Sequence, residues 1–534
     1  MPRAEFDVAV VGAGFAGSIL ARTLVHQGLR VILLERDRHP RFALGESSTP
    51  LANFCLERLA ARYELPDLHR LAAWGRWMAV HPQVRRGLKR GFTFYSHSPG
   101  KAFSPGEDNR NRLLVAASPE DELADSHWLR ADVDAFLARR AVEEGVELRE
   151  GFEVGELSAG KDGFDLVAAG GGEAVTSRFV VDATGPRGVV GEALGAGRRE
   201  PAARFRSRLV YGHFSGVGDF DFDGSFEPGP YPDERAAVHH LLAEGWMYVL
   251  RFDHDCVSAG LVLDGDAEPG EAPDVVWRRV VGRYPSLARQ FDGAAPLRPL
   301  ATIDPIQYRR RLAAAPAGSG AWALLPHVFA FFDPMFSTGI AWSLLSVERL
   351  ATAFGTLVAD PGGDELARRL AAYDRLLRRE AEQIERLIHG AGLARHDPRL
   401  FAAHSFLYFA AVSYEELRQR LVDDDSDTAG DRGFLGAGEP GWESLFEEAV
   451  SRLAGLARCD GPARDHLAAR FELWARRSIA PWNLIGLADP ARRNLYPVDL
   501  TVLRDRSRLL GLSRGELEAR LPRLRGNPAK IAGR

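Results

Sequence analysis

The sequence predicts an α/β fold with a parallel sheet, an antiparallel sheet and a helical C-terminal region. A short apolar run at residues 6–11 leads through glycines into a helical pattern at 18–27 and a second apolar run at 30–34, the order of a βαβ unit. Residues 364–392 carry paired charges at helical spacing. Strand-like runs between loops predict the antiparallel sheet, and they lie at residues 209–214, 247–252 and 257–263.

The predicted elements divide the chain into domains. A helical pattern at 131–144 and a buried strand at 178–181 continue the βαβ unit. Between them, about residues 74–125, Gly, Pro and Asn punctuate a segment that we expect to be an insertion lying against this unit. The expected parts are a first domain of residues 1–200 and 316–355, an antiparallel-sheet substrate domain of 201–315 and a helical region of 356–534.

The composition excludes several functions. The 534 residues carry a formal net charge of −5, so nothing in the charge balance favours binding to nucleic acid or to an anionic membrane. Three cysteines without metal-ligand or paired spacing argue against a disulfide framework and against a zinc site. The N-terminal residues lack a secretory pattern, and the most apolar stretch, 322–340, is broken by Pro, His and Asp. We therefore expect a cytoplasmic protein with no bound metal and no membrane span.

A GxGxxG pattern directly follows the first strand and opens the first helix. Its first glycine makes the tight turn, its second lets backbone amides approach a diphosphate at the helix N-terminus, and its third lets helix and strand pack closely. Glu35 ends the second strand, where an acid accepts hydrogen bonds from ribose hydroxyls. The pattern predicts a Rossmann-like dinucleotide site formed by Gly12, Gly14, Ala16, Gly17, Glu35 and Arg36.

Four later features favour FAD as the dinucleotide. They are a GES segment at 45–47, Arg130, a DATG segment at 182–185 and an Asp-Pro pair at 333–334 followed by Gly339. In this order they resemble the flavin-dependent halogenases of the tryptophan halogenase-like superfamily. The resemblance implies an FAD-binding domain of the glutathione-reductase and p-hydroxybenzoate-hydroxylase type. The FAD contacts it implies are Gly45, Glu46, Ser47, Arg130, Asp182, Gly185 and Asp333.

The resemblance is greatest to the branch that chlorinates tetracycline-type aromatic polyketides. It rests on residues 41–47, 325–327 and 481–490, of which the first is the specific signal. No second GxGxxG occurs in the sequence, so no NAD(P)H site is expected. We therefore expect the reducing equivalents to come from a separate flavin reductase, or FADH2 to bind ready-made.

Lys89 precedes an aromatic run at 92–95, an arrangement similar to the K-x-G-x-x-F segment of the halogenases. In that family a flavin hydroperoxide converts halide to hypohalous acid, which a lysine then directs as a hydrogen-bond donor or as a chloramine. Burial favours the neutral amine that a chloramine requires. The alternative is an ordinary solvated lysine beside Arg85, Arg86 and Arg90.

Residues 332–340 resemble the DPxxSxG segment of the halogenases, in which backbone amides bind the halide. Successive amides at a helix N-terminus form an anion site, so Thr338 and Gly339 are the candidate ligands of chloride or bromide. The alternative is a plain helix start with Ser337 as its cap. Phe336 stands where tryptophan halogenases have a glutamate, which favours a phenolic or polyketide-like substrate.

The family's WxWxIP motif, which separates substrate from flavin, is altered in this sequence. Trp246 is kept, Tyr248 replaces the second tryptophan, and Arg251 replaces the proline. Trp246 and Tyr248 are therefore the expected substrate wall. The altered motif also allows a different enzyme, an FAD-dependent monooxygenase that hydroxylates a small aromatic substrate.

The leading hypothesis is an FADH2- and O2-dependent halogenase that acts on an electron-rich aromatic molecule in secondary metabolism, either free or bound to a carrier. A monooxygenase is the first alternative. A flavin-binding assembly protein without turnover is the second. A Lys89→Ala substitution separates the first two, because only halogenation needs the lysine.

Overall fold

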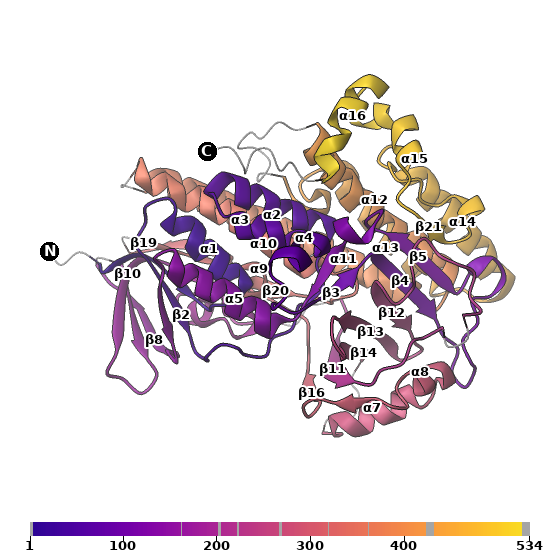
Figure 1. The fold of residues 1–534 in the computed structure, drawn as a ribbon, viewed down its shortest axis with the longest axis horizontal. Coiled ribbons are helices and arrows are strands. Elements are labelled where there is room, and N and C mark those ends of the chain that lie inside the picture. Colours follow the sequence, from indigo (N-terminus) through magenta and orange to yellow (C-terminus); the bar gives the residue numbers. More distant parts are fainter. Residues whose placement is uncertain are drawn as a thin grey trace.

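Two β-sheets lie next to each other and helices cover them in the computed structural model (Figure 1). The structure describes residues 4–161, 163–200, 204–221, 224–265, 270–318, 320–360, 363–422 and 432–525. The first sheet contains the N-terminal βαβ unit, and the second contains the antiparallel strands expected from the sequence. The α/β fold class predicted from the sequence is confirmed.

The first sheet has the order β18-β19-β10-β1-β2-β7, with β8 and β9 attached through β10. From β19 to β7 all neighbours are parallel, whereas β18 is antiparallel to β19. Its strands are β1 (Phe6–Val11), β2 (Val31–Glu35), β7 (Glu147–Glu150), β8 (Val154–Ala159), β9 (Phe164–Ala168), β10 (Ala174–Asp182), β18 (Ala314–Ala317) and β19 (Gly320–Leu324).

β1 is the central strand that positions the candidate site. Val8 pairs with Val31 of β2 on one side and with Phe179 of β10 on the other. Helices cover both faces of such a parallel sheet, which is why β1 and β2 are continuous apolar runs. The carboxyl ends of β1, β2 and β10 therefore meet at one edge, where α/β sheets bind ligands.

The second sheet has the order β15-β11-β14-β13-β12-β4-β5-β21, with β16 attached to β11. The register pairs Tyr211 with Gly260 and Gly260 with Tyr248, so β14 lies between β11 and β13. Its strands are β4 (Gly91–Ser96), β5 (Arg112–Ala116), β11 (Ser207–Ser215), β12 (Ala237–Leu241), β13 (Gly245–Phe252), β14 (Cys256–Asp264), β15 (Ala295–Pro296), β16 (Ala301–Ile303) and β21 (Leu495–Tyr496).

The segment that the sequence marks as an insertion contributes to two sheets. β4 and β5 extend the second sheet, because β4 pairs in parallel with β12. β3 (Arg86–Lys89) and β6 (Asp125–Trp128) form a separate two-stranded ribbon. β17 (Tyr308–Arg309) pairs with β20 (Ala330–Phe331) in a further short ribbon. The segment thus brings the candidate lysine to the junction between the sheets.

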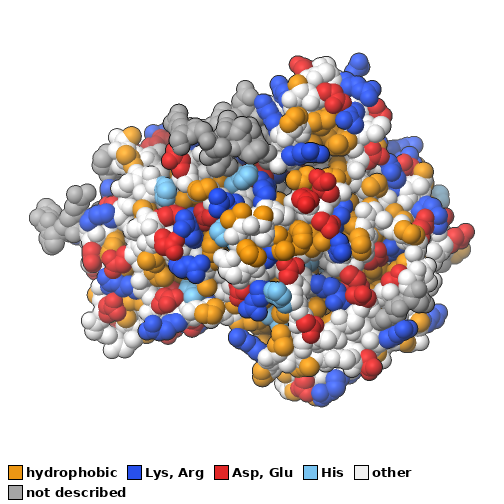
Figure 2. Space-filling model, viewed as in Figure 1, with side chains coloured by type: hydrophobic (Ala, Val, Ile, Leu, Met, Phe, Trp, Pro, Cys, Tyr) orange, Lys and Arg blue, Asp and Glu red, His pale blue; other side chains and the backbone are white. Residues whose placement is uncertain are grey.

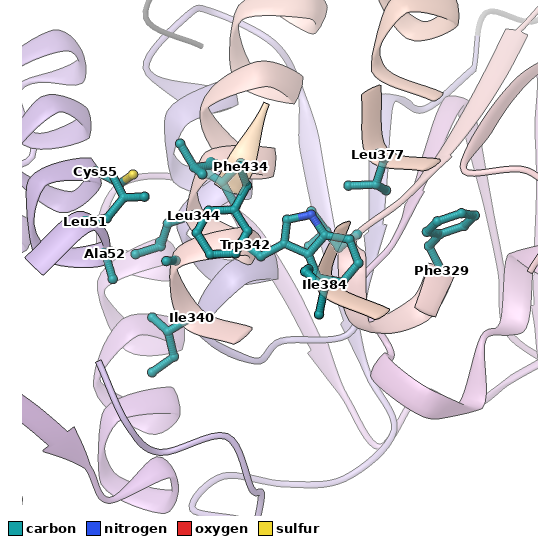
Figure 3. Close-up of a cluster of buried hydrophobic side chains, with 14 of the residues drawn as sticks. Leu51, Ala52, Cys55, Phe329, Ile340, Trp342, Leu344, Leu377, Ile384 and Phe434 are labelled. Atoms are coloured by element: carbon teal, nitrogen blue, oxygen red, sulfur yellow. The ribbon is translucent and has the colours of Figure 1, made fainter. Parts of the chain in front are cut away.

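Helices cover the sheets and form the C-terminal region. α1 contacts α5 on one side and α10 on the other, and α10 also contacts α2 and α11. Figure 3 shows Trp342 of α10 among side chains from α2, α10 and α11. The helices from the N-terminus to α6 and from α9 to α11 are α1 (Phe15–Val25), α2 (Pro50–Tyr63), α3 (Pro66–Leu71), α4 (Trp74–Val80), α5 (Arg130–Glu143), α6 (Val189–Ala193), α9 (Pro326–Phe329), α10 (Thr338–Gly355) and α11 (Asp364–Ala394).

Two shorter helices, α7 (Pro273–Val281) and α8 (Pro285–Gln290), lie below the second sheet in Figure 1. The C-terminal helices gather on the opposite side of the sheet in that view. They are α12 (Pro398–Leu421), α13 (Pro440–Leu456), α14 (Gly461–Ile479), α15 (Leu500–Asp505) and α16 (Arg514–Arg520).

Charges of both signs are interspersed over the face seen in Figure 2, without a large basic field. The cysteines Cys55, Cys256 and Cys459 are all free. Among the described residues, none of the helices combines the length and apolar character that crossing a membrane requires.

Candidate active site

The glycines that follow β1 allow three backbone segments to lie very close together. Gly12 has a φ of 109°, and a Cβ there would lie 2.6 Å from the carbonyl oxygen of Ala183 after β10. A Cβ on Gly17 would lie 2.1 Å from the carbonyl oxygen of Gly12. Any side chain at these positions would push α1 or β10 away from β1, so the turn requires glycine.

Two arginines and the carboxylate of Asp134 lie at the N-terminus of α1, where Asp134 accepts a 3.1 Å hydrogen bond from the Phe15 amide. Gly14 is the N-cap of α1 and has no side chain to cap the helix. A Cβ built on Gly14 would lie 3.4 Å from an Nη of Arg130 and 3.6 Å from an Nη of Arg41. Asp134 holds both guanidinium groups, at 2.9 Å from Arg130 and 3.4 Å from Arg41. Helix amides beside two arginines fit a diphosphate.

Glu35 is buried at the end of β2, as the sequence predicts for the ribose-binding acid. One carboxylate oxygen accepts a 2.9 Å hydrogen bond from the Ala13 amide and another of 2.9 Å from Arg41. Ala16 is half-buried in the first turn of α1. Arg36 points to the surface, where it binds Asp37. The structure therefore brings the glycine turn and Glu35 together and leaves the Arg36 side chain outside.

The GES segment connects the two sheets. Its backbone runs beside β6, because Ser47 bridges to His127 and the Trp128 amide donates to the Glu46 carbonyl oxygen at 2.6 Å. The Glu46 side chain lies 2.9 Å from a ring nitrogen of His213 on β11. Arg130 donates to the Gly45 carbonyl oxygen at 3.1 Å. Arg130 thus links this segment to the start of α1.

Asp182 shapes the turn after β10. One carboxylate oxygen accepts hydrogen bonds from the amide and hydroxyl of Thr184, and the other accepts from the Val190 amide at 2.7 Å. Burial raises the pKa of this carboxyl. Gly185 follows with a φ of 66°. All these contacts are internal, so Asp182 holds the shape of the turn.

Lys89 is completely buried where the ribbon of β3 and β6 meets the second sheet. Its ammonium donates to the Ser48 carbonyl oxygen at 2.5 Å and lies 4.1 Å from the ring centre of Phe92. Burial lowers its pKa well below the usual range, and the carboxylate of Asp125 partly offsets that effect. The structure therefore excludes the alternative of a solvated surface lysine.

Aromatic side chains pack around Phe92, the ring that the Lys89 amine contacts, and its neighbour Phe94. The ring of His239 on β12 stacks on Phe94 at 4.7 Å and lies 5.4 Å from Trp246. Burial lowers the pKa of His239 to about 3, so the imidazole is uncharged. The other rings of the group come from α12 and the start of α10, and they are Phe336, Phe401, Tyr408 and Phe409.

Thr338 and Gly339 form the first turn of α10, at the N-terminus of a long helix. Ser337 precedes them with a φ of 51° and does not cap the helix with its side chain. Its hydroxyl instead lies 3.0 Å from the hydroxyl of Ser47. A Cβ on Gly339 would lie 2.8 Å from Nε2 of His327. Free amides at this helix end can bind an anion.

The start of α10 and the buried Lys89 both contact the same short segment, at the consecutive residues Ser47 and Ser48. The Ser47 hydroxyl contacts Ser337 at the start of α10, and the Ser48 carbonyl oxygen accepts from Lys89. Ser47 and Ser48 therefore fix the position of the Lys89 amine relative to the Thr338 and Gly339 amides, which we expect to bind the halide.

The expected substrate wall lies on one face of β13. Trp246 and Tyr248 are two residues apart, with ring centres separated by 6.2 Å. The indole of Trp246 donates to Asp333 at 3.2 Å, and burial raises the pKa of that carboxyl to about 7. Arg251, which replaces the family's proline, binds Glu234 and the Val217 carbonyl oxygen, so its charge is compensated within the protein.

Sequence reasoning missed several polar residues of this site. Arg41 and Asp134 flank the start of α1, while Asn53 and Asp125 form hydrogen bonds close to Lys89. Of these four residues, the sequence gives a signal only for Arg41, which lies shortly before the GES segment. Within the described ranges, no group of three or more His, Cys, Asp or Glu side chains is arranged to hold a metal ion.

Known proteins share this sequence pattern and fold. Residues 7–327 match the family described as FAD dependent oxidoreductase. The chain is 27% identical to monodechloroaminopyrrolnitrin halogenase PrnC of Pseudomonas fluorescens, over 88% of this chain and 84% of that protein. It is 26% identical to tetracycline 7-halogenase of Kitasatospora aureofaciens, over 92% and 90%.

The crystal structure of halogenase PltM in complex with phloroglucinol and FAD has the same fold. Its TM-score is 0.81 at 22% identity, and the match covers 92% of this chain and 99% of that one. The chain therefore belongs to the FAD dependent oxidoreductase family, and along nearly its whole length it is similar to flavin-dependent halogenases.

Proposed function

We propose that this enzyme chlorinates an electron-rich aromatic molecule, phenolic or polyketide-like, with Lys89 directing the electrophile. The observation that carries the proposal is the burial of Lys89 beside the ring of Phe92. Its amine donates to the carbonyl oxygen of Ser48, and the preceding residue, Ser47, contacts Ser337 at the start of α10. This arrangement puts a reactive amine and an anion-binding helix end on either side of one segment.

The residues around the glycine turn are suited to hold FAD. The α1 amides with Arg41 and Arg130 would bind its diphosphate, and Glu35 would accept hydrogen bonds from its ribose. Reduced FAD, when bound, supplies together with O2 the oxidising power that turns a halide ion into hypohalous acid. With no second GxGxxG in the sequence, we propose that a separate flavin reductase delivers the reduced cofactor.

Thr338 and Gly339 bind the halide in this proposal. Their amides lie at the positive end of the α10 dipole, and no side chain caps them. The uncharged imidazole of His327 lies against Gly339 and leaves little space beside the helix end.

Lys89 carries the electrophilic halogen to the substrate. Burial favours its neutral amine, which is the form that attacks hypohalous acid. The rings of Phe92, Phe94 and Trp246 offer the flat apolar walls that an aromatic substrate needs, and they keep water away from the electrophile. Tetracycline 7-halogenase and monodechloroaminopyrrolnitrin halogenase are named for aromatic substrates, which supports this class.

Substitution of Lys89 tests the proposal. In Lys89→Met, halogenated product should fall at least about a hundredfold, the scale expected when a positioned catalytic group is lost. Oxygen consumption by the FADH2-loaded enzyme should be unchanged. Product is measured by mass spectrometry with chloride or bromide present. Lys101→Ala, at an exposed lysine, is the matched control and should behave as the unaltered protein.

Two results would contradict the proposal. Undiminished halogenated product in Lys89→Met would remove the lysine from the reaction. A hydroxylated, halogen-free product from the unaltered enzyme would favour the monooxygenase hypothesis.

A further inference from the structure

Lys89 directly faces an acidic residue across the ribbon of β3 and β6. The antiparallel register pairs Lys89 with Asp125, and residues opposite each other in such a ribbon have Cβ atoms about 4.5–5.5 Å apart. Both side chains are buried, with exposed fractions of 0% and 2%. A lysine and an aspartate removed together from water are strongly coupled, because each charge is costly there without the other.

Three hydrogen bonds connect the same two residues through α2 and the segment before it. Lys89 donates to the Ser48 carbonyl oxygen, and the Ser48 hydroxyl donates to Oδ1 of Asn53 at 2.8 Å. The Asn53 amide then donates to Oδ1 of Asp125 at 2.8 Å. This chain of hydrogen bonds fixes the position of the Asp125 carboxylate relative to the amine.

The second oxygen of Asp125 has no hydrogen bond. Oδ2 is buried and unpartnered within the part of the chain that the structure describes. Buried carboxylate oxygens normally have a hydrogen-bond donor, so the charge of this carboxylate is little neutralised by hydrogen bonds and acts on the nearby ammonium. Nothing in the sequence motifs or the proposed reaction has so far used this atom.

The other ionisable groups near the pair come from β6, β12 and α12. The imidazoles of His127 and His239 are uncharged, because burial lowers the pKa of each to about 3. The groups of α12 are Tyr408, Glu416 and Arg420. Arg420 binds both Glu57 and Glu416 at 2.6 Å, so its charge is already compensated.

Burial brings the pKa values of Lys89 and Asp125 closer together. It lowers the pKa of Lys89 and raises the pKa of Asp125, while the mutual attraction of their charges opposes both shifts. The two groups are therefore coupled, so that a change of charge on one alters the pKa of the other.

We propose that Asp125 is a positioning residue whose negative charge holds the proton on the Lys89 amine and so sets the pH below which Lys89 cannot react. The inference rests on the function proposed above. Only when the ammonium has lost its proton can the nitrogen lone pair react. The amine then attacks hypochlorous acid, an N–Cl bond replaces O–Cl, and the released hydroxide takes an amine proton to give water. Transfer of chlorine to the arene returns the ring proton to the nitrogen.

A titration of Lys89 itself tests this pair without any turnover. The sequence contains four lysines, so protein labelled with 13C at lysine Cε gives few signals, and Lys89→Met identifies the one from Lys89. In the isosteric Asp125→Asn variant, the Lys89 midpoint should fall by about one pH unit or more, because an opposite charge has been removed. An unchanged midpoint would overturn the inference.

The pH profile of halogenation supplies a second readout. Since the neutral amine persists to lower pH in Asp125→Asn, the acid limb of product formation should move to lower pH while FADH2 oxidation keeps its profile. Asp132→Asn, which removes a carboxylate that binds Arg85, is the matched control and should leave both profiles in place. Acid limbs that coincide in Asp125→Asn and unaltered protein would count against the assignment.

The reciprocal variant covers the case in which Asp125→Asn does not fold. In Lys89→Met the pKa of Asp125 should rise further, so an infrared band of a protonated carboxyl should persist to higher pH than in unaltered protein. Absence of that change would refute the pairing. Failure of the inference leaves the proposed function standing if Lys89→Met still loses product, whereas retained product in Lys89→Met refutes the function itself.

Discussion

Gly339 keeps the first turn of α10 clear of His327. Because an added Cβ would lie 2.8 Å from Nε2 of the imidazole, Gly339→Ala should strain this contact and destabilise the protein by about 1–3 kcal/mol. The strain should be smaller when His327→Ala is also present. Denaturant unfolding gives the free energy of unfolding of the two single variants and of the double variant. The loss in the double variant should be smaller than the sum of the two single losses, and strictly additive losses would disprove the contact.

Single residues were predictable where a motif fixes the chemistry. The glycines after β1, Glu35 and Lys89 carry recognisable patterns, and the structure gives Gly12 and Gly17 of the turn a steric reason. Asp125 and Asn53 carry no pattern, because their importance arises from a register between β3 and β6 and from a hydrogen bond to α2. Such pairings bring together residues distant in sequence, which local patterns do not encode.

At the scale of elements, the approach of α1 to β1 should control cofactor binding. Gly17→Ala places a Cβ 2.1 Å from the Gly12 carbonyl oxygen, so the helix must move away and its amides lose their position at the diphosphate. We expect FAD affinity to fall at least about tenfold, equivalent to roughly 1.4 kcal/mol.

Fluorescence titration with FAD measures this effect. Gly392→Ala, in α11, is the matched control, because nothing lies within 4 Å of the added Cβ. Equal FAD affinity in the two variants would show that α1 does not depend on the close approach.

The elements themselves were largely predictable, but their assembly was not. The strands near 209, 247 and 257 and the helix from 364 are confirmed, with boundaries that differ by a few residues. α1 begins at Phe15 rather than at residue 18, because the helix starts directly after the uncapped Gly14. The position of β4 beside β12 follows from a parallel pairing across more than a hundred residues of chain, for which the Gly- and Pro-rich segment gives no local sign.

At the scale of the whole molecule, a buried ion pair joins the helices that cover the first sheet. Glu380 of α11 accepts from the Trp342 indole at 2.8 Å, from Arg349 of α10 at 2.7 Å and from the Phe434 amide at 2.7 Å. Glu380→Gln leaves the buried guanidinium without its counter-charge, so stability should fall by about 3–5 kcal/mol.

Denaturant unfolding measures this loss against a surface pair on the same helix. Glu382 of α11 lies 3.3 Å from Arg309 and is 45% exposed, so Glu382→Gln should change stability by less than about 1 kcal/mol. Similar losses in both variants would mean that Glu380 has no special part in holding the helices together.

The second sheet is assembled from three distant stretches of chain, and its last strand, β21, pairs with β5 only at Leu495 and Tyr496. During synthesis the ribosome must therefore release nearly the entire polypeptide before this sheet can be completed. Until then the outer side of β5 offers unpaired backbone groups to other chains. Expression of shortened versions that stop before residue 495 should consequently yield aggregates, whatever the condition of the FAD-binding half.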